Sequence, residues 1–160
     1  MLEELAAGFP ILSCILFLPL LGAVGLWLFD DTDLVRSSTL TITLVELALC
    51  VFVLLRFVPD SASMQFTERI QWIPALGISY HLGVDGISVL FVGLTAFLTV
   101  LVVVYSWDTI RQQVKLYMMC LLALETTTMG VFVSLDLILF FVFWELMLIP
   151  SYFLIKLWGG

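Results

Sequence analysis

The chain alternates long apolar runs with short polar segments. Five runs are each long enough to cross the hydrocarbon core of a bilayer, which takes about 20 mostly apolar residues in a helix. They cover residues 9–29, 38–58, 86–107, 116–133 and 135–158. The pattern therefore predicts an all-α membrane protein, a bundle of about five transmembrane helices that forms a single transmembrane region over residues 1–160.

The connections between the runs differ in length. The fourth and fifth runs nearly touch at residues 134–136, which predicts a tight antiparallel helical hairpin. Residues 59–85 form the one long connection, where Pro74 interrupts the helix pattern and apolar residues alternate with polar or small ones. This alternation predicts a small extramembrane β-hairpin. Asp85 follows it and is expected to cap the start of the third helix.

The basic residues give the expected orientation, because cytoplasmic loops collect Lys and Arg. One side of the predicted bundle carries Arg36, Arg111, Lys115 and Lys156, and the other carries Arg56 and Arg69. The bias of four to two places the N-terminus on the periplasmic or equivalent side and the end of the last helix on the inner side.

Composition agrees with a membrane location and excludes several functions. The chain is 62% hydrophobic and 12% charged, with a mean hydropathy of +1.19, whereas soluble domains need more surface charge. Its net charge of −7, without a basic patch, argues against a nucleic-acid partner. The sequence contains three cysteines that occur singly, Cys14, Cys50 and Cys120, and we expect them to be packing residues.

The chain has no metal or nucleotide motif, so we expect no cofactor on it, and any redox centre belongs to other subunits.

Three glutamates, Glu46, Glu125 and Glu145, fall near the centres of predicted helices. A carboxylate at the centre of a bilayer costs about 2.5–3.5 kcal/mol on insertion scales, so its presence indicates a function such as proton transfer. Glu145 is the leading candidate because Pro150 loosens the helix nearby, as happens beside ion sites in transporters. The alternative is that proline is simply common in transmembrane helices.

Glu145 needs a cation to cycle its charge. Tyr152 and Lys156 follow it on one helix face, but Lys156 lies about 16 Å further along the axis and is expected to reach the interface instead. Burial favours a neutral carboxyl and a nearby cation favours the charged form. Since no Lys or Arg lies at a helix centre, the cation partner of Glu145 must come from outside residues 1–160.

The other candidates each have two interpretations. Glu125, followed by three threonines, is either a neutral hydrogen-bonded carboxyl or a proton relay. Glu46, with Thr39 and Thr43 on its own face, is either structural or a peripheral relay. His81 is the only histidine and is expected in the loop before the third helix. It is either an interface residue or a point of proton entry or exit.

Two segments resemble a known family. Residues 81–88 (HLGVDGIS) and 130–160 (GVFVSLDLILFFVFWELMLIPSYFLIKLWGG) are similar to the antiporter-like membrane subunit called chain 4, or chain M in bacteria, of NADH:quinone oxidoreductase. The resemblance implies a fourteen-helix subunit of complex I or of its photosynthetic relative, which pumps protons without a redox centre. It also implies that Glu145 is the family's glutamate, paired with a lysine on a later broken helix. The family continues beyond this point, so we interpret the chain as the N-terminal third of such a subunit, either a fragment or one piece of a split subunit.

The first hypothesis is therefore a proton-translocating subunit of complex I, which is a translocase although this chain alone is not an enzyme. Its membrane would be a bacterial inner membrane, a thylakoid or a mitochondrial inner membrane. Its partners would be other membrane-arm subunits, the lipid bilayer and protons. The alternatives are a subunit of a multisubunit sodium/proton antiporter and a truncated structural membrane scaffold.

Overall fold

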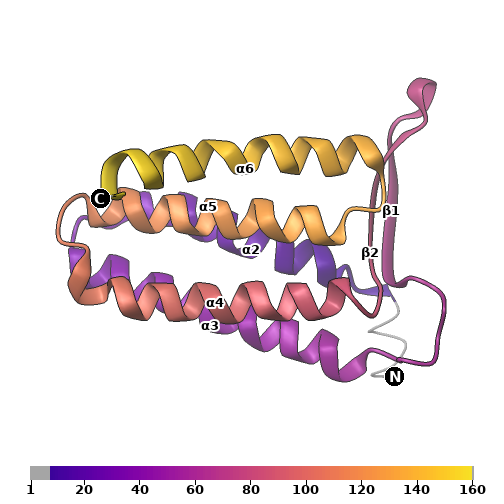
Figure 1. Ribbon diagram of the computed structural model, residues 1–160, viewed down its shortest axis with the longest axis horizontal. Helices are drawn as coiled ribbons and strands as arrows, with labels where there is room; N and C mark the ends of the chain where they lie inside the picture. The colour runs from indigo at the N-terminus through magenta and orange to yellow at the C-terminus, as the bar shows by residue number, and fades with distance from the viewer. Residues whose placement is uncertain (1–7, 160) are drawn as a thin grey trace.

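The computed structural model describes residues 8–159. Five helices are long and apolar enough to cross a membrane, and they lie side by side along the long axis of the molecule (Figure 1). They are α2 (Ile11–Gly25, continued by the short 3-10 helix η1, Leu26–Leu28), α3 (Thr32–Arg56), α4 (Ser88–Thr109), α5 (Val114–Val133) and α6 (Leu137–Trp158). The prediction of an all-α membrane protein with five spans is confirmed.

One predicted helix boundary was wrong. Helix α3 begins at Thr32 and not near residue 38, because the Asp31 side chain accepts a hydrogen bond from the Leu34 N–H at 3.3 Å and caps the helix. A run of apolar residues predicts only the part of a helix that lies in the hydrocarbon core. The first turns of α3 are polar, so the apolar run does not include them, although the cap keeps them helical.

The long connection forms the predicted β-hairpin. Strands β1 (Gln65–Ile73) and β2 (Ile78–Val84) are antiparallel and are joined by the 3-10 turn η2 (Pro74–Leu76) and by Gly77, whose φ of +67° is left-handed. His81 lies in the connection before the third helix, as expected, and there it is part of β2, opposite Arg69. The alternating pattern continues through His81 to the end of β2, and pairing with β1 keeps it extended.

The hairpin stands across one end of the helices and is bound to the start of α2 (Figure 1). The Glu68 carboxylate in β1 accepts hydrogen bonds from the main-chain N–H of Leu12 at 2.8 Å and of Ser13 at 3.2 Å. The Ser13 hydroxyl also donates to Glu68 and lies 2.7 Å from the Tyr80 hydroxyl of β2. Pro10 provides no side-chain cap, so Glu68 satisfies amides that the start of α2 would otherwise leave free.

The same hairpin is bound to the start of α6 on its other strand. The Asp136 carboxylate accepts hydrogen bonds from the N–H groups of Ser79 and Ile138, both at 2.9 Å. The Leu135 N–H donates to the His81 carbonyl at 2.8 Å. Strand β2 therefore fixes the tight connection between α5 and α6.

Asp85 caps α4 as predicted. Its carboxylate accepts hydrogen bonds from the N–H of Ser88 at 2.7 Å and of Ile87 at 3.0 Å, and the Ser88 hydroxyl accepts one from the Asp85 N–H at 2.9 Å. This reciprocal arrangement is a capping box. The bonds from Ser88 hold the pKa of Asp85 below its usual value, because they stabilise the charged carboxylate.

Helix α5 is central, and α6 lies at the edge. Helix α5 packs against α2, α3, α4 and α6, whereas α6 packs mainly against α5 and touches the hairpin through β2. Gly130 allows the Phe143 ring to lie directly on α5, since a Cβ at this position would overlap the ring. Most of the remaining α6 surface is therefore left uncovered by this chain.

Candidate functional site

The three glutamates of the sequence lie at a similar depth in the bundle. Glu125 is eight residues before the end of α5 at Val133, and Glu145 is eight residues after the start of α6 at Leu137. Glu46 is ten residues before the end of α3. At 1.5 Å per residue, all three lie about 12–15 Å from the hairpin end of the molecule. They form one layer inside the membrane-spanning part.

Two of the three meet in the interior. Glu46 on α3 and Glu125 on α5 are neighbours, with 0% and 2% of their surfaces exposed. Cys50, one turn further along α3, lies beside both. Among the described residues neither carboxyl has a hydrogen-bond partner. The nearby Thr99 hydroxyl of α4 donates instead to the Thr95 carbonyl, at 2.9 Å.

The threonines around Glu46 share its buried face, as the sequence predicts. Thr39 and Thr43 are fully buried together with Glu46. Their hydroxyls donate to the carbonyls of Val35 at 2.8 Å and of Leu40 at 3.0 Å. These hydroxyls satisfy the helix backbone, so they do not donate to the carboxylate.

Glu125 also reaches a small cavity. The cavity has a volume of about 220 Å³, lies between α4 and α5 and opens to the outer face of the bundle, where Leu98 and Val102 are exposed. Its polar lining consists of Glu125 with Thr95, Thr99 and Thr128, and four apolar residues complete it. The Thr128 hydroxyl donates to the Leu124 carbonyl at 2.8 Å, which leaves its oxygen free to accept a further hydrogen bond.

Glu145 is separate from this pair. It lies on the exposed side of α6 and makes no hydrogen bond or ion pair within residues 8–159. Tyr152 and Lys156 are exposed on the same helix, and the Lys156 Nζ lies 5.2 Å from the centre of the Tyr152 ring. Tyr152 and Lys156 therefore share one face of α6, as the sequence predicts. Glu145 is exposed on this chain, unlike the other two glutamates, because α6 is an edge helix.

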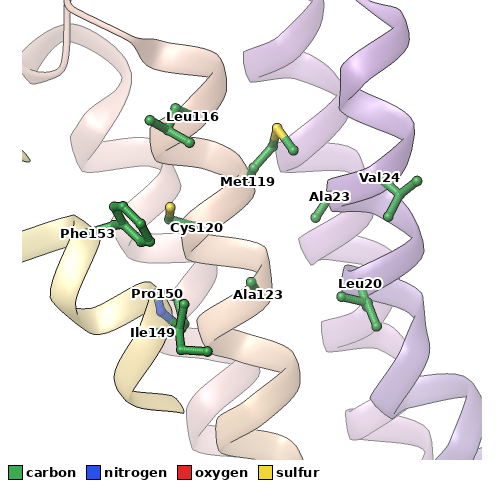
Figure 2. Close-up of a pocket in the computed structure, with 10 residues that line it drawn as sticks. All are labelled: Leu20, Ala23, Val24, Leu116, Met119, Cys120, Ala123, Ile149, Pro150 and Phe153. Atoms are coloured by element: carbon green, nitrogen blue, oxygen red, sulfur yellow. The ribbon is translucent and has the colours of Figure 1, made fainter. Parts of the chain in front are cut away.

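Pro150 lies in an apolar environment. Helix α6 continues through Pro150, which lines a cavity of about 350 Å³ between α2, α5 and α6. Figure 2 shows Cys120 of α5, Phe153 of α6 and Leu20 of α2 around the same space. No charged or hydroxyl side chain lines this cavity, so it suits an apolar group and not a proton path.

His81 lies outside the glutamate layer. It is half-buried in β2, and its side chain makes no hydrogen bond among the described residues. The hairpin stands at the end of the bundle, so His81 is separated from the three glutamates by about 12 Å or more of helix. Within residues 8–159, no group of three His, Cys, Asp or Glu side chains could hold a metal ion.

The pairing of Glu46 with Glu125, and the place of Cys50 beside them, were not predicted. One signal was present in the sequence. Thr39, Thr43, Glu46 and Cys50 recur at spacings of four, three and four, so they form a polar stripe on one face of α3. In an apolar helix such a stripe indicates the side that faces other helices.

No family model matches the chain. Curated proteins do match it. The chain is 35% identical to NADH-quinone oxidoreductase subunit M of Rickettsia conorii over 94% of its length, and 37% identical to NADH-ubiquinone oxidoreductase chain 4 of Marchantia polymorpha over 100%. The chain is a relative of the subunit M and chain 4 proteins. It spans about a third of their length, 32% and 33% in these two cases.

The fold also occurs in a solved structure of a respiratory membrane complex. A chain of the archaeal membrane-bound sulfane sulfur reductase superposes with a TM-score of 0.73 at 20% sequence identity. The match covers 92% of this relative of subunit M and 23% of the archaeal chain. At that identity the likeness establishes the fold alone. The five apolar helices and the similarity to the subunit M and chain 4 proteins support an integral membrane protein.

Proposed function

We propose that this chain is the N-terminal part of a proton-translocating membrane-arm subunit of a quinone oxidoreductase related to complex I. The observation that carries the proposal is the position of Glu145 on α6. The residue lies in the middle of a 22-residue apolar helix and points away from the chain's own bundle. A carboxylate facing lipid there would cost about 2.5–3.5 kcal/mol, so this face of α6 is covered by further protein in the membrane.

In this proposal Glu145 exchanges a proton with its surroundings. Removal from water favours the neutral carboxyl, and the approach of a cation favours the charged form. The outward position of Glu145 fits a cation that comes from outside residues 1–160, since Lys156 interacts with Tyr152 instead. Approach and withdrawal of that cation would make Glu145 release and take up a proton. The redox chemistry that drives this movement belongs to other subunits.

Charges at the ends of the bundle support the proposed orientation. At the end opposite the hairpin, Lys115 forms an ion pair with Asp30 at 2.9 Å and the Arg36 guanidinium donates to the Ile110 carbonyl at 2.9 Å. Four of the six basic residues lie at this end. We assign it to the cytoplasmic or equivalent side, which places the β-hairpin on the periplasmic side.

The test is Glu145→Gln in the full-length subunit within its assembled complex. Glutamine keeps the shape and hydrogen bonding of the side chain but cannot cycle a charge. We expect loss of most coupled proton pumping, with lower quinone reductase activity and normal assembly. Cys120→Ala is the control, because Cys120 is buried against apolar neighbours and lines the apolar cavity between α2, α5 and α6.

Two outcomes would contradict the proposal. Glu145→Gln complexes that assemble and still acidify the outer compartment at the wild-type rate would make Glu145 a structural residue. Transport that follows a sodium gradient in the wild-type complex, without coupling to quinone reduction, would favour a subunit of a sodium/proton antiporter instead. A purely structural scaffold would show no effect of Glu145→Gln on any transport measurement.

A further inference from the structure

The buried pair Glu46 and Glu125 is costly unless it binds something. Both side chains are at least 98% buried, and all four carboxylate oxygens lack a hydrogen-bond partner among the described residues. An isolated buried carboxylate is strongly disfavoured, and two adjacent ones also repel each other. The groups that face the pair are the Cys50 thiol from α3 and the Thr99 hydroxyl from α4, and neither carries a positive charge. The pair therefore needs a bound cation, and the smallest is a proton.

We propose that Glu46 and Glu125 form a two-carboxyl proton site inside the bundle, in which the carboxyls share one proton and Glu125 exchanges a second through the cavity between α4 and α5. The site uses side chains of α3 and α5 and does not depend on the role of Glu145. In the singly protonated state, one carboxyl donates its O–H to the carboxylate of the other. This bond satisfies the donor and spreads the single negative charge over both groups.

The cavity determines which carboxyl exchanges the proton. Glu125 lines the 220 Å³ space together with the hydroxyls of Thr95, Thr99 and Thr128, whereas Glu46 does not line it. A space of this size with several polar groups on its wall has room for several water molecules. Those hydroxyls already donate to helix carbonyls, so their oxygens are free to accept hydrogen bonds from water. A proton therefore reaches Glu125 first and Glu46 second.

A proton fits this site better than a metal cation. Metal ions held by oxygen ligands need roughly six or more of them in a defined shell. Within residues 8–159 no group of three His, Cys, Asp or Glu side chains is placed to hold a metal ion, and the pair itself offers four carboxylate oxygens. The hydroxyls of Thr39 and Thr43 donate to helix carbonyls along the face of Glu46. A shared proton needs two carboxyl groups and no other ligand.

Dicyclohexylcarbodiimide tests the site directly, because this apolar reagent adds to protonated carboxyl groups within membranes and leaves a stable acylurea. The assembled complex with its full-length subunit is labelled over a range of pH and analysed by peptide mass spectrometry. We expect labelling at Glu125, which lines the cavity, and less labelling at Glu46, which does not. Labelling should persist to higher pH in the wild type than in Glu46→Gln, since the second carboxylate opposes loss of the last proton.

The matched control is Glu145→Gln, which should leave the pH profile of labelling at Glu125 unchanged whether or not it abolishes pumping. Failure of the carboxyl pair and failure of the role proposed for Glu145 are thus distinguishable. Two results would overturn the pair: identical pH profiles in the wild type and Glu46→Gln, or protection of Glu125 by sodium ions at constant pH. The second needs only the wild-type complex, so it does not depend on folding of a variant.

A second readout asks whether the carboxyls act as a unit. Proton pumping is compared among Glu46→Gln, Glu125→Gln and the double variant, all in assembled complexes. If the two share a proton, the double variant should lose no more activity than the more impaired single variant. If the two glutamates instead act as independent relays, the fold-loss of pumping in the double variant should equal the product of the fold-losses in the two single variants. That result would contradict the proposal.

Discussion

The main-chain N–H of Ser79 in β2 donates a hydrogen bond to the Asp136 carboxylate at 2.9 Å, and the same carboxylate accepts the Ile138 N–H, also at 2.9 Å, in the first turn of α6. One side chain therefore caps a transmembrane helix and binds an extramembrane hairpin to it. The β-hairpin is thus fixed to the end of the helical bundle, and its position depends on the charged carboxylate of Asp136.

This relationship predicts a pH dependence. The hydrogen bond from the Ser79 N–H is the main cause that holds the pKa of Asp136 below its usual value. The pKa of Asp136 is thus lower in the folded protein than in the unfolded chain, where it is about 3.9. The charged carboxylate therefore stabilises the folded state above about pH 3.9, and this stabilisation is lost as the pH falls through the pKa of the folded protein. Hydrogen exchange at the Ser79 amide, corrected for the intrinsic rate, should therefore lose protection below about pH 4.

Asp136→Asn should make that protection weaker at neutral pH and independent of pH across the same range. The amide oxygen of asparagine still accepts a hydrogen bond, but a neutral acceptor binds the N–H groups less strongly. Equal protection in the wild type and in Asp136→Asn at neutral pH would show that the charge is not what binds the hairpin.

Glu68→Gln should loosen the start of α2. The Glu68 carboxylate accepts the N–H groups of Leu12 and Ser13, so the substitution removes a negative charge from a helix N-terminus. We expect a loss of about 1 kcal/mol in the local opening free energy, measured as faster amide exchange at these two residues. Glu68→Asp keeps the charge on a shorter side chain and should be intermediate. An unchanged exchange rate in Glu68→Gln would contradict this cap.

Gly130→Ala should destabilise the contact between α5 and α6. The new methyl group would overlap the Phe143 ring, and overpacking of this kind costs about 1–3 kcal/mol. The thermal stability of the assembled complex should fall, and Phe143→Leu in the same chain should restore part of it. Gly93→Ala is the matched control in α4, because nothing lies within 4 Å of its added methyl group. Similar effects of the two glycine substitutions would rule out a specific overlap.

Orientation can be tested with single cysteines at the two ends of the molecule. Ser63 precedes β1 and Gln112 precedes α5, and both are exposed. A membrane-impermeant maleimide should modify Ser63→Cys from the periplasmic or equivalent side and Gln112→Cys from the opposite side. The parent protein, with its three native cysteines, gives the background. Reaction of Ser63→Cys from the cytoplasmic face would reverse the proposed orientation.

Several features follow from sequence alone because they depend on local properties. The five spans follow from the lengths of the apolar runs, and four of the predicted helices agree with the structure within a few residues at each end. The β-hairpin follows from alternating residues and from Pro74 and Gly77 at its turn. Asp85 is recognisable as a cap from its place before the third helix. In each case the signal lies within a few neighbouring residues.

Features that depend on how each helix is rotated about its axis required the tertiary structure. Glu46 and Glu125 meet because α3 and α5 pack with these faces together, although the residues are 79 positions apart in the chain. Helix α6 is apolar on nearly all sides, so its sequence gives no indication of which face is buried. Contact of Phe143 with Gly130 fixes that rotation and leaves Glu145 on the uncovered side. The sequence thus determined which carboxyls lie within the membrane, and the packing of the helices decided that two of them form a pair while the third faces outward.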